Sequence, residues 1–94
     1  MAAYLIAHID VHDPVRYEDY KRMVPASITA FGGRFLARGG QVEVLEGGWV
    51  PKRLVLIEFP SAADAHAWWE SEQYAPAKAA RRAASDAEMI LLHG

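Results

Sequence analysis

Glu58 is the residue whose sequence surroundings most favour acid–base chemistry. It interrupts the run Arg53–Phe59, in which every other residue after the arginine is aliphatic or aromatic. Such a run is typical of a central strand buried on both faces. A carboxylate deprived of water there holds its proton more tightly and suits the role of general base. The alternative is structural, an ion pair between Glu58 and Arg34 or Arg38 that holds the fold together.

His8 is the predicted partner of that carboxylate. It lies in Tyr4–Val11, a predicted strand with one apolar face and one mixed face that carries the histidine. In the topology derived below, this strand neighbours the Glu58 strand, so we expect the two side chains to meet as base and orienting group. Arg38 is predicted to bind the ligand by stabilising developing negative charge. The alternative for His8 is an interface histidine that only makes hydrogen bonds.

Three aromatic residues, Trp68, Trp69 and Tyr74, are predicted to surround a pocket between a helix and the sheet. Adjacent helical residues point about 100° apart, so the two tryptophans cannot face the same way. We therefore expect one tryptophan in the core and the other at a rim or pocket. Trp69 and Tyr74 are the predicted ligand-binding residues of this group.

Neither a metal site nor a cofactor is predicted. His8, Asp10 and His12 alternate along one strand face, but His12 falls where the strand should turn, and no further ligands cluster with them. His66 sits on a helix where a haem ligand is conceivable, yet its alanine neighbours fit an ordinary solvent-facing position. The paired glycines are not followed by the Gly-Lys-Ser/Thr of a phosphate loop.

The elements that must position these residues follow from local patterns. Asp13-Pro14 opens a helix whose apolar stripe ends at Phe31, with a kink expected at Pro25. Ser61 and Asp64 form a capping box at the start of the helix that carries the tryptophans. The remaining expected elements are a strand over Arg34–Glu46 bent at Gly39-Gly40, the Arg53–Phe59 strand, a helix over Pro76–Ala84 and a last strand over Glu88–Leu92.

The resulting order is strand, helix, strand, strand, helix, strand. Right-handed crossovers then give an α+β, ferredoxin-like βαββαβ sandwich, an antiparallel sheet with its helices on one face. The second face carries Leu54, Leu56 and Leu36, which water should not contact. A second copy covering this helix-free face is the simplest solution, so we predict a homodimer.

Size and charge exclude several classes of function. The 94 residues suit one domain spanning 1–94. A net charge of −2 and an isoelectric point near 6.0 give no electrostatic footprint for nucleic acid or an anionic membrane. There is no cysteine, no basic start of a signal peptide and no membrane-length apolar run. We expect a cytoplasmic protein that binds neither nucleic acid nor membrane.

Several segments together resemble a known family. They are Tyr4-Leu5-Ile6-Ala7, Asp13-Pro14 with Tyr17 and Tyr20, Gly32-Gly33-Arg34-Phe35-Leu36-Ala37-Arg38-Gly39-Gly40, Glu46-Gly47-Gly48-Trp49, and Ile57-Glu58-Phe59-Pro60-Ser61 with Trp68-Trp69 and Tyr74. The chain is similar, nearly end to end, to the domain-of-unknown-function family 1330, a branch of the dimeric α+β barrel superfamily. The resemblance implies two ferredoxin-like subunits with their sheets face to face. That superfamily includes cofactor-independent monooxygenases, haem-handling enzymes, isomerases and non-catalytic members.

Two functional hypotheses remain at this stage. One is a dimeric domain that binds or transforms a small organic molecule by proton transfer or cofactor-free oxygenation, with Glu58 as base, His8 as relay and Arg38 beside them. The other is a non-catalytic structural or ligand-binding homodimer in which Glu58 pairs with an arginine. Whether the protein is an enzyme stays open here, because structural ion pairs and catalytic carboxylates share these sequence features.

Overall fold

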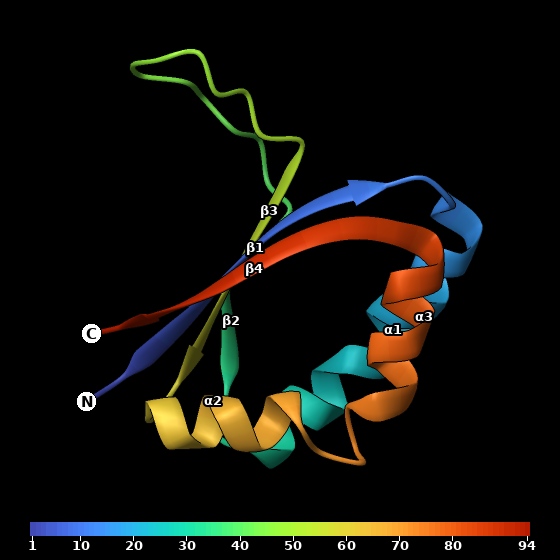
Figure 1. The fold of residues 1–94 in the computed structure, drawn as a ribbon, viewed down its shortest axis with the longest axis vertical. Coiled ribbons are helices and arrows are strands. Elements are labelled where there is room, and N and C mark those ends of the chain that lie inside the picture. The colour runs from blue at the N-terminus through green and yellow to red at the C-terminus, as the bar shows by residue number, and fades with distance from the viewer.

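The computed structural model describes all residues 1–94 and confirms the predicted α+β plan. Its elements are β1 (Ala3–Val11), α1 (Pro14–Ala30), β2 (Arg34–Arg38), β3 (Arg53–Phe59), α2 (Ala62–Trp69), α3 (Ala75–Ala84) and β4 (Ser85–His93). The sheet has the order β2-β3-β1-β4 with antiparallel neighbours throughout. All three helices lie on one side of it (Figure 1), which is the ferredoxin-like arrangement.

Alternation along the central strands separates a core face from an outer face. In β3, Val55, Ile57 and Phe59 are buried against the helices, whereas Leu54 and Leu56 on the other face stay half-exposed. The prediction that this strand is buried on both faces is therefore wrong for a single copy. Helices cover only one face, and on the other only the segment 39–52 comes into contact, near His8 and Leu54.

Helix α1 supplies the core stripe predicted for it. Asp13 caps its start, with Oδ1 accepting the Arg16 backbone N–H at 3.1 Å, and Gly32 follows its end in the left-handed region at φ 77°. The helix runs unbroken through Pro25. Because Pro25 has no N–H, the Lys21 carbonyl loses its usual helical partner. The buried stripe consists of Tyr17, Tyr20, Val24, Ser27 and Ile28.

The predicted capping box of α2 forms only in part: the Ser61 hydroxyl caps the helix, but the Asp64 carboxylate accepts from that hydroxyl and not from the Ser61 backbone N–H. Ser61 Oγ accepts the Asp64 backbone N–H at 3.1 Å and donates to Asp64 Oδ2 at 2.9 Å. This cap fixes where α2 begins, and hence which way its two tryptophans point. No helix of the chain is long and apolar enough to cross a membrane.

Two boundaries differ from the prediction. The second strand ends at Arg38, and the expected continuation over 41–46 is an irregular, mostly exposed segment. Residues 39–52 form an arm that projects from the sheet, away from the helices (Figure 1). The last strand, in turn, starts at Ser85, earlier than expected, because β4 follows α3 directly and pairs with β1 as far back as Val11.

Candidate functional site

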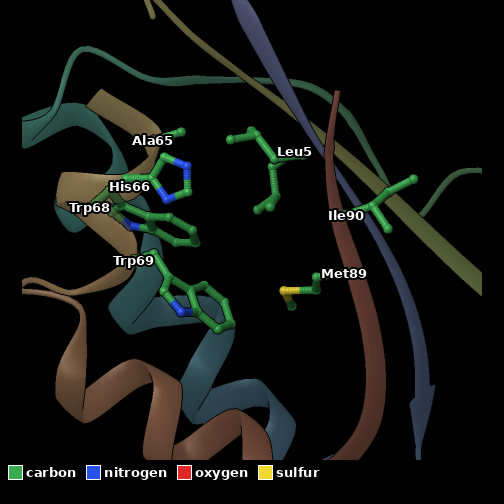
Figure 2. Close-up of a pocket in the computed structure, with 8 residues that line it drawn as sticks. Leu5, Ala65, His66, Trp68, Trp69, Met89 and Ile90 are labelled. Carbon is green, nitrogen blue, oxygen red and sulfur yellow. The ribbon is translucent and has the colours of Figure 1, made fainter. Parts of the chain in front are cut away.

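An apolar cleft lies between α2 and the strands β1 and β4 (Figure 2). Its volume is about 170 Å³. Seven of its eight lining residues are hydrophobic, and the eighth is His66. The lining residues are Leu5, Ala65, His66, Trp68, Trp69, Met89, Ile90 and Leu91.

Helical and strand spacing explain why these residues meet. Ala65 and Trp69 are four residues apart in α2 and so lie on one side of the helix. Leu5 of β1 is paired with Leu91 of β4, and both follow the alternation that points toward the helices. The cleft is therefore the space between this side of α2 and the inner face of β1 and β4.

The two tryptophans divide as predicted, one into the core and one toward a pocket rim. Trp68 is buried and stacks on Tyr74 with ring centroids 4.0 Å apart. Trp69 is half-exposed at the cleft, with the Lys78 ammonium 4.4 Å from its ring centroid. The Trp69 indole points toward Met89 of β4 (Figure 2), while the buried Trp68 ring forms part of the cleft wall.

Tyr74 is a correction to the sequence prediction. Its side chain is fully buried and lines no cavity, so it does not reach a ligand in the cleft. It sits at the start of α3, where its ring packs against Trp68 and its hydroxyl accepts a hydrogen bond from Arg81 Nε at 3.3 Å. Tyr74 therefore supports the wall of the cleft from within the core.

Glu58 makes the ion pair that the structural alternative describes. Arg34 Nε donates to its Oε1 at 2.8 Å across the β2–β3 ladder. Glu58 points to the helix-free face and lines no cavity. A base needs room beside it for the group whose proton it takes, and this carboxylate has an arginine there instead.

The predicted contact between His8 and Glu58 is wrong. His8 pairs with Leu54 in the ladder whereas Glu58 pairs with Tyr4, four residues further along β1. At about 3.4 Å per residue the two positions are roughly 14 Å apart. The strands are neighbours as predicted, but their register separates the two side chains.

His8 belongs instead to a shallow hollow on the helix-free face, at the base of the arm. Its Nε2 accepts the backbone N–H of Lys52 at 3.1 Å, and its Nδ1 lies 3.6 Å from Glu88 Oε1. Its ring lies nearly perpendicular to that of Trp49, with an interplanar angle of 79° and centroids 5.6 Å apart. These contacts hold the arm against the sheet, and they occupy the ring nitrogen that would act as a base.

Arg38 is also separated from Glu58, because a β-bulge in β2 reverses the alternation. Phe35 pairs with Ile57, but Ala37 pairs with Leu56 and Arg38 with Val55, which leaves Leu36 as the extra residue. Val55 faces the helices, so its neighbour Arg38 faces them too. A strand without the bulge would keep Arg38 on the same face as Arg34.

Metal-binding side chains do not gather anywhere in the chain. No three His, Cys, Asp or Glu side chains come together in a way that could hold an ion. Asp10 of the alternating histidine–aspartate motif accepts from Lys52 Nζ at 3.3 Å instead.

Most residues of the cleft could not be predicted from the sequence. Met89 and Leu91 lie on the inner face of β4, and only the β1–β4 register brings them opposite Ala7 and Leu5. The sequence predicts an ordinary solvent-facing position for His66, with a haem ligand as the alternative. His66 is exposed, but its ring stands at the cleft (Figure 2). The sequence does place His66 three residues before Trp69, and residues at this spacing are neighbours on the surface of a helix.

Comparisons with known proteins place the chain in a fold and a family. The sequence matches the profile of the Domain of unknown function (DUF1330) over residues 2–94. No curated protein matches it in sequence.

Solved structures of the same fold include a protein of unknown function from Rhodopseudomonas palustris, with a TM-score of 0.78 and 20% identity over 99% of this chain and 82% of that one. SnoaB, a cofactor-independent oxygenase from Streptomyces nogalater, has a TM-score of 0.69 and 16% identity, covering 99% and 92%. A putative antibiotic biosynthesis monooxygenase from Nitrosomonas europaea has a TM-score of 0.59 and 16% identity, covering 99% and 89%. At these identities the likeness shows the fold alone.

Proposed function

Because the chain belongs to the DUF1330 family, whose name assigns no reaction, we propose a function from the site: the cleft beside α2 binds a small, mostly apolar organic molecule. The observation that carries this proposal is an almost wholly hydrophobic lining with a single imidazole. Ligand sites commonly combine apolar walls with a few polar groups that orient the ligand. A dry protein cavity of about 150 Å³ accepts benzene. A cleft of about 170 Å³ therefore suits a group the size of one aromatic ring.

The chemistry we propose is proton removal from that ligand by His66. Histidine is the side chain best suited to exchange a proton near neutral pH. An electron-rich aromatic molecule that loses a proton becomes an anion able to react with O₂ without a cofactor. The shared fold of a cofactor-independent oxygenase supports this reading. The base is thus assigned to His66, in place of Glu58 and His8, while Trp69 keeps its role as a ligand contact.

Intrinsic fluorescence tests the binding step. Trp49 lies on the arm, away from the cleft, so a Trp49→Phe protein reports only the cleft tryptophans. Hydroquinone added to this protein should quench its emission with saturation. Trp69→Ala in the same background should weaken binding about two- to tenfold, since an aromatic contact contributes about 0.5–1.5 kcal/mol. Quenching that never saturates, or that is unaffected by Trp69→Ala, would show that hydroquinone does not occupy the cleft.

An oxygen electrode separates binding from reaction. His66→Gln should retain hydroquinone binding and lose any protein-dependent oxygen consumption. The matched control is His93→Gln, which alters an exposed histidine outside the cleft. Oxygen consumption by His66→Gln equal to that by His93→Gln would refute the role of His66, and no protein-dependent consumption by the wild type would leave a binding protein.

We further propose that two copies pair through the helix-free face. Large apolar side chains stand exposed there, including Leu36 at 44%, Ile90 at 63% and Leu92 at 54%. Contiguous apolar surface of this kind is typical of interfaces. Native mass spectrometry should give twice the chain mass. Leu56→Asp should give single chains, and Val15→Asp, which alters an exposed residue of α1, should not. A monomeric wild-type protein would refute the pairing.

A further inference from the structure

A polar hollow of about 360 Å³ lies beside α1, and it shares no residue with the apolar cleft. Its lining contains four cationic side chains and one carboxylate. The whole chain carries a net charge of −2, so the hollow is a local cluster of positive charge on a chain that is negative overall. The lining residues are Glu18, Lys21, Arg22, Arg38 and Arg53.

The acidic side chains at this hollow do not neutralise it. Glu18 Oε1 accepts from Lys21 Nζ at 2.9 Å, and Asp19 pairs with Arg22. Arg38 and Arg53 form no ion pair with any carboxylate. The hydrogen bond and charge of Lys21, with the charges of Arg22 and Arg53 adding to them, lower the pKa of Glu18. Two positive charges therefore remain without an anion.

Arg53 is the most unusual member, because its Nε is buried and has no hydrogen-bond partner. It is the only buried side-chain nitrogen or oxygen of the chain in that condition. Its guanidinium lies over the Tyr17 ring, 5.4 Å from the centroid, and packs against Gly39. Gly39 has φ 70°, and a Cβ there would collide with the guanidinium. Buried donors are almost always satisfied, so the guanidinium that lines this hollow has hydrogen-bonding capacity that the chain leaves unused.

Arg38 is held beside the Arg53 guanidinium by a backbone carbonyl that Pro25 leaves without its helical hydrogen bond. Pro25 has no N–H to donate to the Lys21 carbonyl. That carbonyl accepts a hydrogen bond from Arg38 Nη2 at 2.8 Å instead. The guanidinium also lies over Phe35, 4.4 Å from the ring centroid. Since Arg38 pairs with Val55, two residues from Arg53, the two arginines are diagonal neighbours on the helix side of the sheet. Backbone and ring contacts thus fix one guanidinium next to the unpartnered one.

We propose that this hollow, defined by Lys21, Arg22, Arg38 and Arg53, is a binding site for a phosphate group. Guanidinium forks match phosphate oxygens in pairs, which gives both direction and strength. A phosphate monoester carries about −1.5 to −2 charges near neutral pH, which equals the charge left without a partner here. Free phosphate and the phosphate of a small organic ester present the same oxygens to the arginines.

Titration with inorganic phosphate, followed by ¹H–¹⁵N NMR at low ionic strength, tests the site. Saturable shifts should appear at the amides of Gly39, Arg53 and Lys21. Arg53→Met should weaken binding at least tenfold. The matched control is Arg16→Met, which removes an exposed arginine of α1 already paired with Asp13 and should change the affinity less than twofold. Equal losses of phosphate affinity in the two variants would show that only the overall positive charge matters, and would overturn the proposal.

Further variants and probes keep the test decisive. If Arg53→Met does not fold, Arg38→Met replaces it, because Arg38 is exposed and outside the core. Gly39→Ala should also weaken binding by displacing the Arg53 guanidinium. Phenyl phosphate titrated in parallel identifies the source: tighter binding than phosphate indicates an organic ester, and weaker binding indicates the free ion. Absence of saturable shifts with both probes would overturn the proposal.

Discussion

A buried hydroxyl, that of Ser27, connects α1 to the wall of the apolar cleft. Its Oγ accepts the indole N–H of Trp68 at 3.1 Å and donates to the Val24 carbonyl at 2.7 Å. Ser27 is 4% exposed and Trp68 1%, so water cannot replace the hydroxyl at the indole. Ser27→Ala should therefore leave the indole donor buried and unsatisfied. The expected cost is about 1–3 kcal/mol, the desolvation penalty of such a group.

That cost is large for so small a protein. Domains have free energies of unfolding of about 0.05–0.15 kcal/mol per residue, or roughly 5–14 kcal/mol for a chain of this length. A loss of about 2 kcal/mol should lower Tm by roughly 8–16 °C. Urea unfolding followed by circular dichroism measures the free energy directly. The control is Thr29→Ala, an exposed position of the same helix, which should change stability by no more than about 0.5 kcal/mol.

A double-mutant cycle isolates the hydrogen bond itself. In a Trp68→Phe background no indole donor exists, so Ser27→Ala should cost little more than the Thr29→Ala control. The same cost in both backgrounds would show that the hydroxyl acts through Val24 or packing alone. A Ser27→Ala protein as stable as wild type would refute the reasoning entirely.

Two further predictions concern charges elsewhere in the fold. Glu58→Gln should lower the free energy of unfolding by less than about 1 kcal/mol, because Arg34 is 71% exposed and water screens the pair; a loss above about 3 kcal/mol in urea would contradict this. Burial, with smaller contributions from Tyr74 and Tyr17, raises the pKa of Tyr20 far above its ordinary value of about 10. The unfolded chain then ionises first as pH rises, so stability is full below pH 10 and falls by about 1.4 kcal/mol per pH unit above it. Urea midpoints at pH 8 and pH 11 should differ less for Tyr20→Phe than for wild type, and equal differences would contradict the assignment.

The parts of the fold that the sequence predicted are those set by local pattern. The stripe of α1, the Ser61 cap and the apolar alternation of β1 each depend on residues a few positions apart. The order of these elements then leaves few topologies, because crossovers are right-handed. Neighbouring strands were therefore predictable, including the adjacency of β1 and β3.

The parts that escaped prediction depend on register and pairing between distant segments. One bulge at Leu36 moved Arg38 to the helix side, and four ladder positions separated His8 from Glu58. Residues 41–46 alternate like a strand, yet alternation alone forms no ladder without a neighbour, and this segment has none. The cleft around His66 likewise depends on how far α2 stands from β4, which no local pattern records.

The place of β4 at one edge of the sheet affects how the protein can be handled. β4 pairs only with β1, so along nine residues the outward-facing backbone N–H and C=O groups have no neighbouring strand. Such an edge is a template for adding strands from other chains. Asp86 and Glu88 place charge on its first half, but Met89–Leu92 carries none. Ordered aggregation at high concentration should therefore start from the C-terminal half of this strand, where a single lysine would protect the protein best.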